Sequence, residues 1–507
     1  MRVLRRFALV GALALVSSAH IGSPDVWFDG AAGPYKVLVH VQPPPVVPGI
    51  AVVNVQVTDP TVTRVTALVN TFDATGAAPP PDVAAPIPGR PTWYSTRLWV
   101  MEGGSNGVTV GVSGSRGNGF VVVPLTALPT RRLAFGGILA VLLPVAGVIL
   151  ALGLFTIVGA AVREGVLPPG AEPDAQRRRR ARLAMARAVF VLALVIVGTA
   201  AWWRAEDSSF TRRLYRPMPV RTAIDTATGQ LHFTITDSIW AHRNDIAWLR
   251  ARRIPALNDL ALIEDHGKLV HLFLISADGH SAFAHLHPAT TDSVTFTAPL
   301  PNVPAGTYSL FADIVHESGL AQTLTSTVSV PVRRTATESS RMDADDSWAV
   351  GRAATESASG SPTRSMLDDG TVLTWSRPAT NPLVAGEEAD FHFVAVPPPG
   401  DTASLEPFLG MAAHAVVVRD DAKVFIHLHP LGTISLAAQA RLTPSSSGGT
   451  SHAMSMTVAP DSLYFPYAFP QPGKYTVWVQ VKRKGRVMTG SFPAEVRAKG
   501  RDGAAAP

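Results

Sequence analysis

Histidines form two clusters in the C-terminal part of the chain, and their residue types and spacing favour metal ligation. The chain has 15 histidines and no cysteine, so thiolate ligands are excluded and a soft metal must be held by imidazole or thioether groups. The tetrapeptide His-Leu-His-Pro occurs twice, at His285–Pro288 and at His427–Pro430. The two clusters hold ten of the histidines: His266, His271, His280, His285 and His287 in the first, and His392, His414, His427, His429 and His452 in the second.

The spacing of each histidine pair predicts that both imidazoles point the same way. In a β-strand, residues i and i+2 face one side, so His285 and His287 project together, as do His427 and His429. The proline after each pair ends the strand. A neighbouring antiparallel strand begins at His271 in one copy and at His414 in the other, and either could bring a third imidazole. We therefore predict a metal site in each copy.

Methionines near the second pair favour copper there. Met411 lies three residues before His414, and His452, Met454 and Met456 alternate along one expected strand face. Thioether and imidazole ligands together suit copper, Cu(I) especially, whereas zinc more often recruits cysteine or carboxylate. The first copy lacks these methionines and has carboxylates nearby, so Cu(II) or zinc is the expected ion there.

A structural role for the same histidines stays open. The His-Leu-His-Pro segment can form a corner in which the imidazoles hydrogen-bond to backbone carbonyl groups, with no metal. Its repetition would then preserve a packing feature inherited from one ancestor. Ring nitrogens that converge on a common point favour ligation, whereas rings sealed against carbonyl oxygens favour the structural role.

The N-terminal segment has the features of a secretory signal. Basic residues precede an apolar core, and small residues end at Ala19, so residues 1–19 are expected to be removed. Cleavage there would leave His20 first, and its α-amino group and imidazole together could chelate Cu(II), with His40 as a third ligand. The alternatives are an uncleaved anchor helix and an ordinary surface histidine.

Two apolar stretches are expected to span a membrane. Residues 133–162 carry no charge over 30 positions, and residues 183–203 form a second span whose end carries Trp202 and Trp203. The loop between them contains the run Arg177–Arg180, which places the loop in the cytoplasm. The segments 20–130 and 205–507 are then both extracytoplasmic, which agrees with the signal sequence.

The remaining sequence predicts a mainly β protein with three immunoglobulin/cupredoxin-like β-sandwich domains beside the two transmembrane helices. Short Val/Thr-rich runs separated by Pro- and Gly-rich turns are typical of sandwiches. Matching motif order indicates an internal duplication of residues 215–333 and 365–497. We expect a sandwich at 20–130, a flexible tether at 334–364 and a disordered tail at 498–507.

Two resemblances follow from these motifs. Residues 19–130, through Ala19-His20-Ile21-Gly22 and the strand at His40, resemble the YtkA-like and copper-resistance-protein-C-like envelope domains. This resemblance implies copper binding at His20 alone. The repeats, through Gly410-Met411-Ala412-Ala413-His414 and His427–Pro430, are similar to secreted bacterial domains described as heavy-metal-binding or cupredoxin-like.

Composition and motifs narrow the function classes. Charged residues make up 16% of the chain against 47% hydrophobic ones, which fits a globular protein with membrane spans. The net charge of +6 arises largely from one arginine run without aromatics, so we expect no nucleic-acid partner. Because no Walker loop, GxSxG or HExxH motif occurs, we expect no enzyme. The expected function is a metal-binding protein anchored in the cytoplasmic (inner) membrane, facing the periplasm or exterior, which buffers or delivers ions. The alternative is a scaffold that docks an envelope protein partner.

Overall fold

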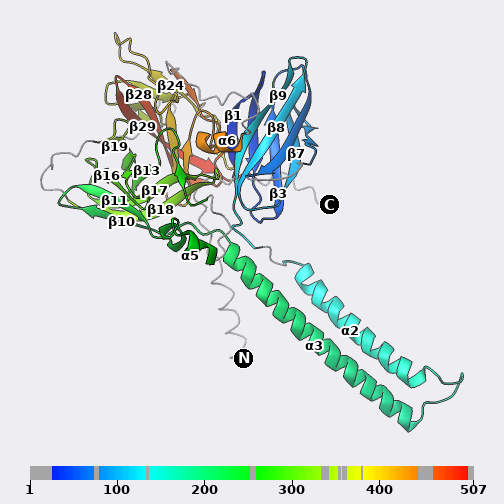
Figure 1. Cartoon of the computed structure of the whole chain (residues 1–507). Helices are drawn as coiled ribbons and strands as arrows, with labels where there is room; N and C mark the ends of the chain where they lie inside the picture. Colours follow the sequence, from blue (N-terminus) through cyan, green and yellow to red (C-terminus); the bar gives the residue numbers. More distant parts are fainter. Residues whose placement is uncertain are drawn as a thin grey trace. The chain divides into compact units, whose positions relative to one another are not determined.

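The protein is mainly β, with two long apolar helices (Figure 1). This computed structural model describes residues 25–72, 79–132, 136–251, 259–332, 342–351, 355–356, 362–377, 381–443 and 461–500. The chain divides into two compact units. One unit comprises Met1–Leu128 and Arg216–Pro507 and contains the β-structure, and the other comprises Pro129–Tyr215 and contains the helix pair.

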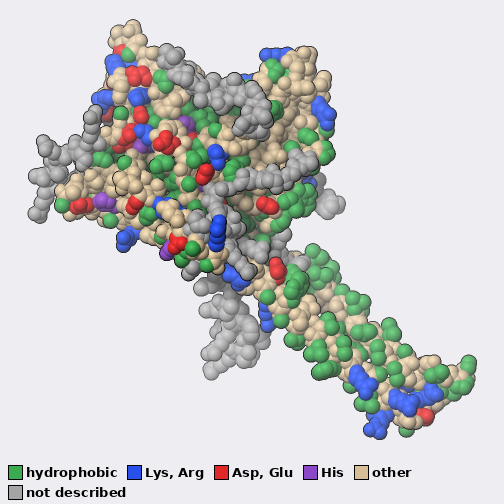
Figure 2. Space-filling view, viewed as in Figure 1, with side chains coloured by type: hydrophobic (Ala, Val, Ile, Leu, Met, Phe, Trp, Pro, Cys, Tyr) green, Lys and Arg blue, Asp and Glu red, His purple; other side chains and the backbone are tan. Residues whose placement is uncertain are grey.

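The helical unit consists of α2 (Leu139–Glu164) and α3 (Ala175–Arg213). Both helices are long and apolar enough to cross a membrane, with mean hydropathies of 2.7 and 2.3 over their apolar windows, and these windows are 0% buried. Helix α3 has 39 residues, or about 58 Å at ~1.5 Å per residue, and extends beyond the predicted span at both ends. Asp174 caps its N-terminus, with a side chain that accepts a hydrogen bond from the Arg177 amide. Basic side chains gather at the loop end of the pair (Figure 2).

The N-terminal sandwich contains two antiparallel sheets, as predicted for residues 20–130. Its strands alternate buried and exposed positions, and valines from both sheets fill the core between them. The first sheet has the order β1 (Val26–Ala32), β2 (Tyr35–Gln42), β3 (Gly49–Gln56), β7 (Arg90–Val100), β6 (Ala85–Ile87). The second has the order β5 (Asp82–Val83), β4 (Val62–Thr71), β8 (Gly104–Gly114), β9 (Gly117–Ala127).

Repeat 1 is a second sandwich, with the short helices α4 (Ser238–Ala241) and α5 (Ile246–Ala251) beside it. Its outer sheet has the order β10 (Val220–Asp225), β11 (Gln230–Ile235), β16 (Thr295–Pro299), β15 (Ala289–Thr290). Its inner sheet has the order β12 (Leu262–Ile263), β17 (Gly306–His316), β13 (His271–Ser276), β14 (Ala282–Leu286), β19 (Ser347–Val350), with β18 (Ala321–Val330) also paired to β17. Strand β19 comes from the segment expected to be a tether, so residues 342–351 differ from that expectation.

Repeat 2 is a third sandwich, to which the short helix α6 (Leu436–Leu442) is added. Its outer sheet has the order β20 (Thr355–Glu356), β21 (Pro362–Met366), β22 (Val372–Trp375), β24 (His392–Val396), β27 (Ser462–Tyr464). Its inner sheet has the order β23 (Leu383–Val384), β29 (Arg486–Arg497), β28 (Gly473–Arg483), β25 (His414–Arg419), β26 (Phe425–Leu428).

The two repeats share local geometry as well as motif order. Tyr308 in β17 donates its hydroxyl hydrogen to the carbonyl of Pro304 (2.8 Å), four residues earlier. Tyr475 in β28 donates in the same way to the carbonyl of Gln471 (2.7 Å). Both strands are 11 residues long and begin at a glycine. These matching details support a duplication.

The inner sheets of the repeats pack face to face. Aromatic rings meet across this interface: Phe311 stacks on Phe425 with ring centroids 4.2 Å apart, and Phe283 stacks on Trp478 at 5.0 Å. The shared core contains Phe273, Ile275, Phe283 and Phe311 from repeat 1 and Val416, Val418, Phe425 and Trp478 from repeat 2. Each inner sheet is therefore covered on both faces, by its own outer sheet and by the other repeat.

Candidate metal centre

Strand pairing places the predicted histidines at the interface between the repeats. In repeat 1, Phe273 of β13 lies opposite His285 of β14. In repeat 2, Val416 of β25 lies opposite His427 of β26. Directly paired residues point to the same side of a sheet, so each histidine set shares a face with the apolar side chains of the interface.

The two predicted sites are one cluster. The seven side chains that form it, here called the histidine cluster, are no more than 7% exposed. Between repeats, the rings of His271 and His427 lie 5.4 Å apart, and those of His266 and His429 lie 4.9 Å apart. The expectation of a separate site in each copy therefore does not describe the arrangement. The members of the histidine cluster are His266, His271, His285, His287, His414, His427 and His429.

His266 was counted among the histidines of the sequence but not nominated as a ligand. It lies in a tight turn between Asp265 and Lys268, where its φ of 55° and that of Gly267 are both positive. Repeat 2 has the same turn, with Leu409 at the equivalent position. A histidine before a glycine, a few residues ahead of His271, is the sequence signal that could have indicated it.

Burial and mutual repulsion keep the inner histidines neutral. Desolvation is the largest cause that lowers the pKa of His271, His285, His414 and His429 well below the usual value. The charges of neighbouring histidines lower these pKa values further, with His427 acting on all four. Desolvation also lowers the pKa of His266. Neutral imidazole is the form that binds metal ions, so the environment favours the ligating state.

Several histidines bond outward through one ring nitrogen. His287 donates from Nδ1 to the Asp346 carboxylate (3.0 Å), and His429 donates from Nδ1 to the carbonyl of Ile434 (3.1 Å). Nδ1 of His427 lies 3.4 Å from the Asp313 carboxylate. Such contacts to carboxylates and carbonyls orient metal-binding histidines and leave the second nitrogen as the ligand.

The inward nitrogens lack partners. Nε2 of His266, His287, His427 and His429 and both ring nitrogens of His414 are buried without a hydrogen-bond partner among the described residues. A buried polar atom without a partner costs roughly 1–3 kcal/mol. Five such side chains in one interface are therefore costly, unless an ion bridges their nitrogens.

Two nitrogens of the cluster face each other closely. His271 donates from Nε2 to the carbonyl of Asp265 (3.1 Å), so its Nδ1 is unprotonated and has a free lone pair. His285 donates from Nδ1 to Oε1 of Gln480 (3.0 Å), because the amide nitrogen of Gln480 is directed to Ser347. The two remaining nitrogens lie 3.2 Å apart. Two ligands on one tetrahedral ion at ~2.0–2.1 Å would be about 3.3 Å apart.

The ligand atoms gather into two sets of three. In the first triad, His271, His285 and His287, one ring nitrogen of each lies within 4.8 Å of the others. In the second triad, His266, His414 and His429, the same limit holds. The first triad belongs to repeat 1 alone, whereas the second combines His266 of repeat 1 with two residues of repeat 2.

The supporting contacts cross between repeats at equivalent positions. Asp313 is the eighth residue of β17 and contacts His427 of repeat 2. Gln480 is the eighth residue of β28 and contacts His285 of repeat 1. The histidine of repeat 2 thus has a charged partner where the histidine of repeat 1 has a neutral one. Both contacts hold the ring orientation of the histidine that they support.

Carboxylates also lie at one edge of the cluster. Asp343 and Asp346 are within 4.8 Å of His287 when one ligand atom of each is compared. Lys268 donates to both carboxylate oxygens of Asp343 at 2.7 Å. A cationic group therefore already neutralises this edge, and the imidazole triads are the better candidates for an ion.

Some sequence-predicted residues lie elsewhere or outside the description. His20, His452, Met454 and Met456 fall outside the described residues, as does the signal segment. Met411 is buried at the end of the turn Phe408–Met411, at the position equivalent to Lys268.

Three further histidines have other neighbours. His280 contacts Thr476 (3.2 Å), and His392 stacks on Tyr464 with ring centroids 4.5 Å apart. His40, the third ligand expected beside His20, stacks on Trp27 and pairs with Asp25.

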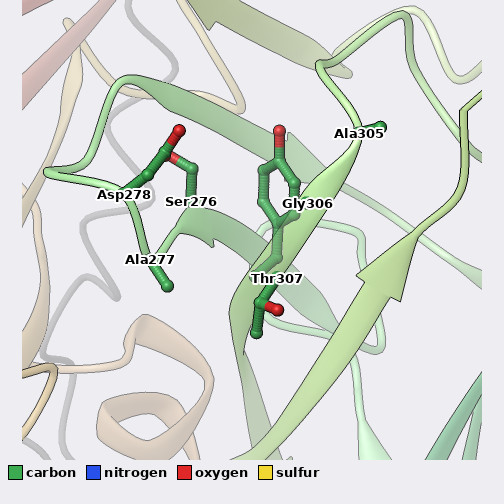
Figure 3. Close-up of a pocket in the computed structure, with 7 residues that line it drawn as sticks. Ser276, Ala277, Asp278, Ala305, Gly306 and Thr307 are labelled. Carbon is green, nitrogen blue, oxygen red and sulfur yellow. The ribbon is translucent and has the colours of Figure 1, made fainter.

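A surface pocket lies at the other end of β13 from His271 (Figure 3). Ser276 and Asp278 line one side, and Ala305 and Thr307 line the other. It holds no histidine, and its lining offers one carboxylate only. The histidine cluster is therefore the stronger candidate site.

Comparisons with known proteins bear on the repeats alone. A family model described as "Domain of unknown function (DUF8832)" matches residues 252–332 and 366–498. The match spans both repeats and includes all seven members of the histidine cluster, but it does not extend to the N-terminal sandwich. No curated protein matches the chain.

Two solved structures are similar at a low level. Dimeric latent PorU from Porphyromonas gingivalis is 10% identical with a TM-score of 0.14, and the alignment covers 89% of this chain and 32% of that one. The ICAM-5 D1–D4 ectodomain fragment is 9% identical with a TM-score of 0.14, and the alignment covers 89% of this chain and 74% of that one. The chain thus spans about a third of the PorU chain.

Proposed function

We propose that this chain is a membrane-anchored extracytoplasmic metal-binding protein, with copper preferred, for ion buffering or delivery. The observation that carries the proposal is the set of inward ring nitrogens without partners in a buried interface. Outward nitrogens of the same rings bond to carboxylates and carbonyls. This combination is typical of ligands held ready for an ion.

A purely structural role accounts for fewer of these features. A hydrogen bond between His271 and His285 would need the Gln480 amide reversed, so that Ser347 donates to it. Even then, the inward nitrogens of His266, His414 and the other unpartnered rings would stay unexplained. Bound cations would give each of these rings a partner at one nitrogen.

The donor set supports copper before zinc. Imidazole nitrogens suit both ions, and among first-row divalent metals the affinity of a given nitrogen site peaks at Cu²⁺. No thioether is needed for this preference. Zinc is the second candidate because four-coordinate imidazole sites also suit it.

The membrane part of the proposal rests on the helix pair and its charges. Helices α2 and α3 are long and apolar enough to span, and the run Arg177–Arg180 lies in the first turns of α3, just after the loop between them. Basic loops stay in the cytoplasm. The β-structure on both sides of the pair would then face the periplasm or exterior, with the lipid bilayer as its anchor.

The direct test is a copper titration of the full-length protein in detergent, against a competing chelator. We expect the variant His427→Ala/His429→Ala to bind Cu(II) more than about 100-fold more weakly, since even the loss of a second-shell partner costs 10–100-fold. The matched control is His392→Ala, which removes an exposed histidine outside the cluster. A separate 365–497 fragment is unsuitable, because it lacks His266 and the first triad.

Equal copper affinity in the double variant and the wild type would overturn this proposal. The alternative, a scaffold that docks an envelope partner, predicts something different in metal-free buffer. In a scaffold the histidines contribute packing alone, so the double variant should melt at a lower temperature without metal. Unchanged melting of the metal-free variant would count against the scaffold.

A further inference from the structure

We infer that the histidine cluster holds two metal ions, one in each triad, with His427 as a fourth ligand available to either ion. This inference rests on the proposed function and specifies how many ions bind and how they share ligands. It follows from the arrangement of seven imidazoles into two separate sets of three, with the seventh between them.

The triads share no residue but adjoin each other. Ring centroids within the first triad are 4.5 to 5.4 Å apart. The nearest rings of different triads are more widely spaced, at 6.1 Å for His266 and His271 and 6.5 Å for His285 and His414. The side chains of both triads are buried, and each triad contains at least one inward nitrogen without a partner among the described residues. One ion cannot reach all six rings, so a single site would leave a triad unsatisfied.

The ring of His427 lies beside both triads. It is 5.4 and 5.5 Å from His271 and His285 of the first, and 5.3 and 4.5 Å from His414 and His429 of the second. Nε2 has no partner among the described residues, while Nδ1 is occupied by Asp313. One free nitrogen can bind one ion at a time, so His427 completes four-coordination for whichever ion holds it.

Negative charge is available for two divalent cations. Asp346 bonds to His287 of the first triad. Asp265 lies 3.7 Å from Nε2 of His266 in the second triad, and Asp313 contacts His427 between them. The three carboxylates are distributed over the two triads and the shared ligand. This distribution offsets the cost of placing two cations in a buried site.

The shared ligand makes the two binding steps unequal. The first ion takes His427 and has four imidazoles, which leaves three for the second ion. Repulsion between the ions weakens the second step further. Replacement of His427 should therefore weaken the first step more than the second and bring the two dissociation constants closer together.

Metal content and electron paramagnetic resonance of the Cu(II)-loaded full-length protein test this inference. The background carries His20→Ala and His452→Ala, which remove the other sequence-predicted histidine ligands. We expect two ions per chain in this background, and one ion after either His287→Ala or His266→Ala. His427→Ala should retain two ions, with the first step weakened at least about 10-fold. Double loading should broaden the resonance through coupling between neighbouring ions.

The outcomes separate this inference from the proposal on which it rests. One ion per chain, abolished by His287→Ala and by His266→Ala alike, would overturn the two-ion arrangement and leave the proposed function intact. If the loaded protein contains no ion, both this inference and the proposed function are wrong. The resonance of the background protein needs no triad substitution, so an uncoupled spectrum at full loading would contradict the inference even if the triad variants failed to fold.

Discussion

Copper should raise the melting temperature of the metal-free full-length protein by roughly 15 °C or more. Ligands come from both repeats, so an ion binds the docked state and not the unfolded one. Each ion at about 1,000 times its Kd adds about 4 kcal/mol. For a cooperative unit of about 150–250 residues, close to the size of the two docked repeats, 1 kcal/mol corresponds to roughly 2–4 °C. Differential scanning calorimetry in detergent, with and without Cu(II), measures the shift.

Two variants serve as controls for this shift, His427→Ala/His429→Ala and His392→Ala. In His427→Ala/His429→Ala the stabilisation by copper should fall to a few degrees, whereas His392→Ala should behave as the wild type. A chelator should return the loaded protein to the metal-free melting temperature. Equal shifts in the double variant and the wild type would mean that copper acts at another site.

Mild acid should destabilise the metal-free protein strongly. The folded-state pKa values of His271, His285, His414 and His429 lie well below that of an unfolded histidine, chiefly because of burial. The unfolded chain therefore binds more protons below pH 6.5, so stability is complete above that pH and is lost as the pH falls toward the folded-state values. Each such histidine contributes about 1.4 kcal/mol per pH unit, and four together about 5 kcal/mol.

Melting curves from pH 8 to pH 5 in chelator check this prediction. Asp343, Asp369 and Asp421 do not obscure the window, because their pKa values lie below the usual 3.8 and their contribution is lost at lower pH. Burial raises the pKa of Asp29, which is common to the wild type and the double variant, so the comparison of the two slopes removes its contribution. The melting temperature should fall less steeply with pH in His427→Ala/His429→Ala, because this variant lacks the buried His429. A flat profile between pH 5 and pH 7 would show that the histidines do not titrate on unfolding.

The local part of the site could be predicted because strands have a period of two. That rule placed His285 with His287 and His427 with His429, and the strands that begin at His271 and His414 lie beside them as expected. Hydropathy likewise indicated both apolar helices. Helix α3 runs past both ends of the predicted span because the span is flanked by arginine and alanine residues, which are good helix formers.

The docking of the repeats could not be derived from the period alone. Strand β13 is buried at all six positions, and its Leu272-Phe273-Leu274-Ile275 run is apolar on both faces. Such a run is typical of a strand covered on both faces, so it indicates that a second layer packs on the inner sheet. It does not say which surface covers it. The two histidine groups were therefore expected to lie apart, whereas the docked repeats bring them into one cluster.

The supporting carboxylate at His287 had no sequence signal. Asp346 precedes the four-residue strand β19 within a polar, Ser- and Ala-rich segment. Composition favoured a tether there, because so short a strand adds little apolar content. Its pairing with β14 positions Asp346 at His287, a contact over 59 residues of sequence that depends on the folded sheet.

X-ray absorption at the copper K-edge of the loaded full-length protein tests the central claim most directly. The account predicts a first shell of nitrogen alone at about 2.0 Å, with the multiple-scattering pattern of three to four imidazoles per ion. At single loading, His427→Ala/His429→Ala should lower the imidazole scattering from that of four rings to that of the three rings of the first triad. A shell dominated by oxygen, or by sulfur without several imidazoles, would contradict ligation by the histidine cluster.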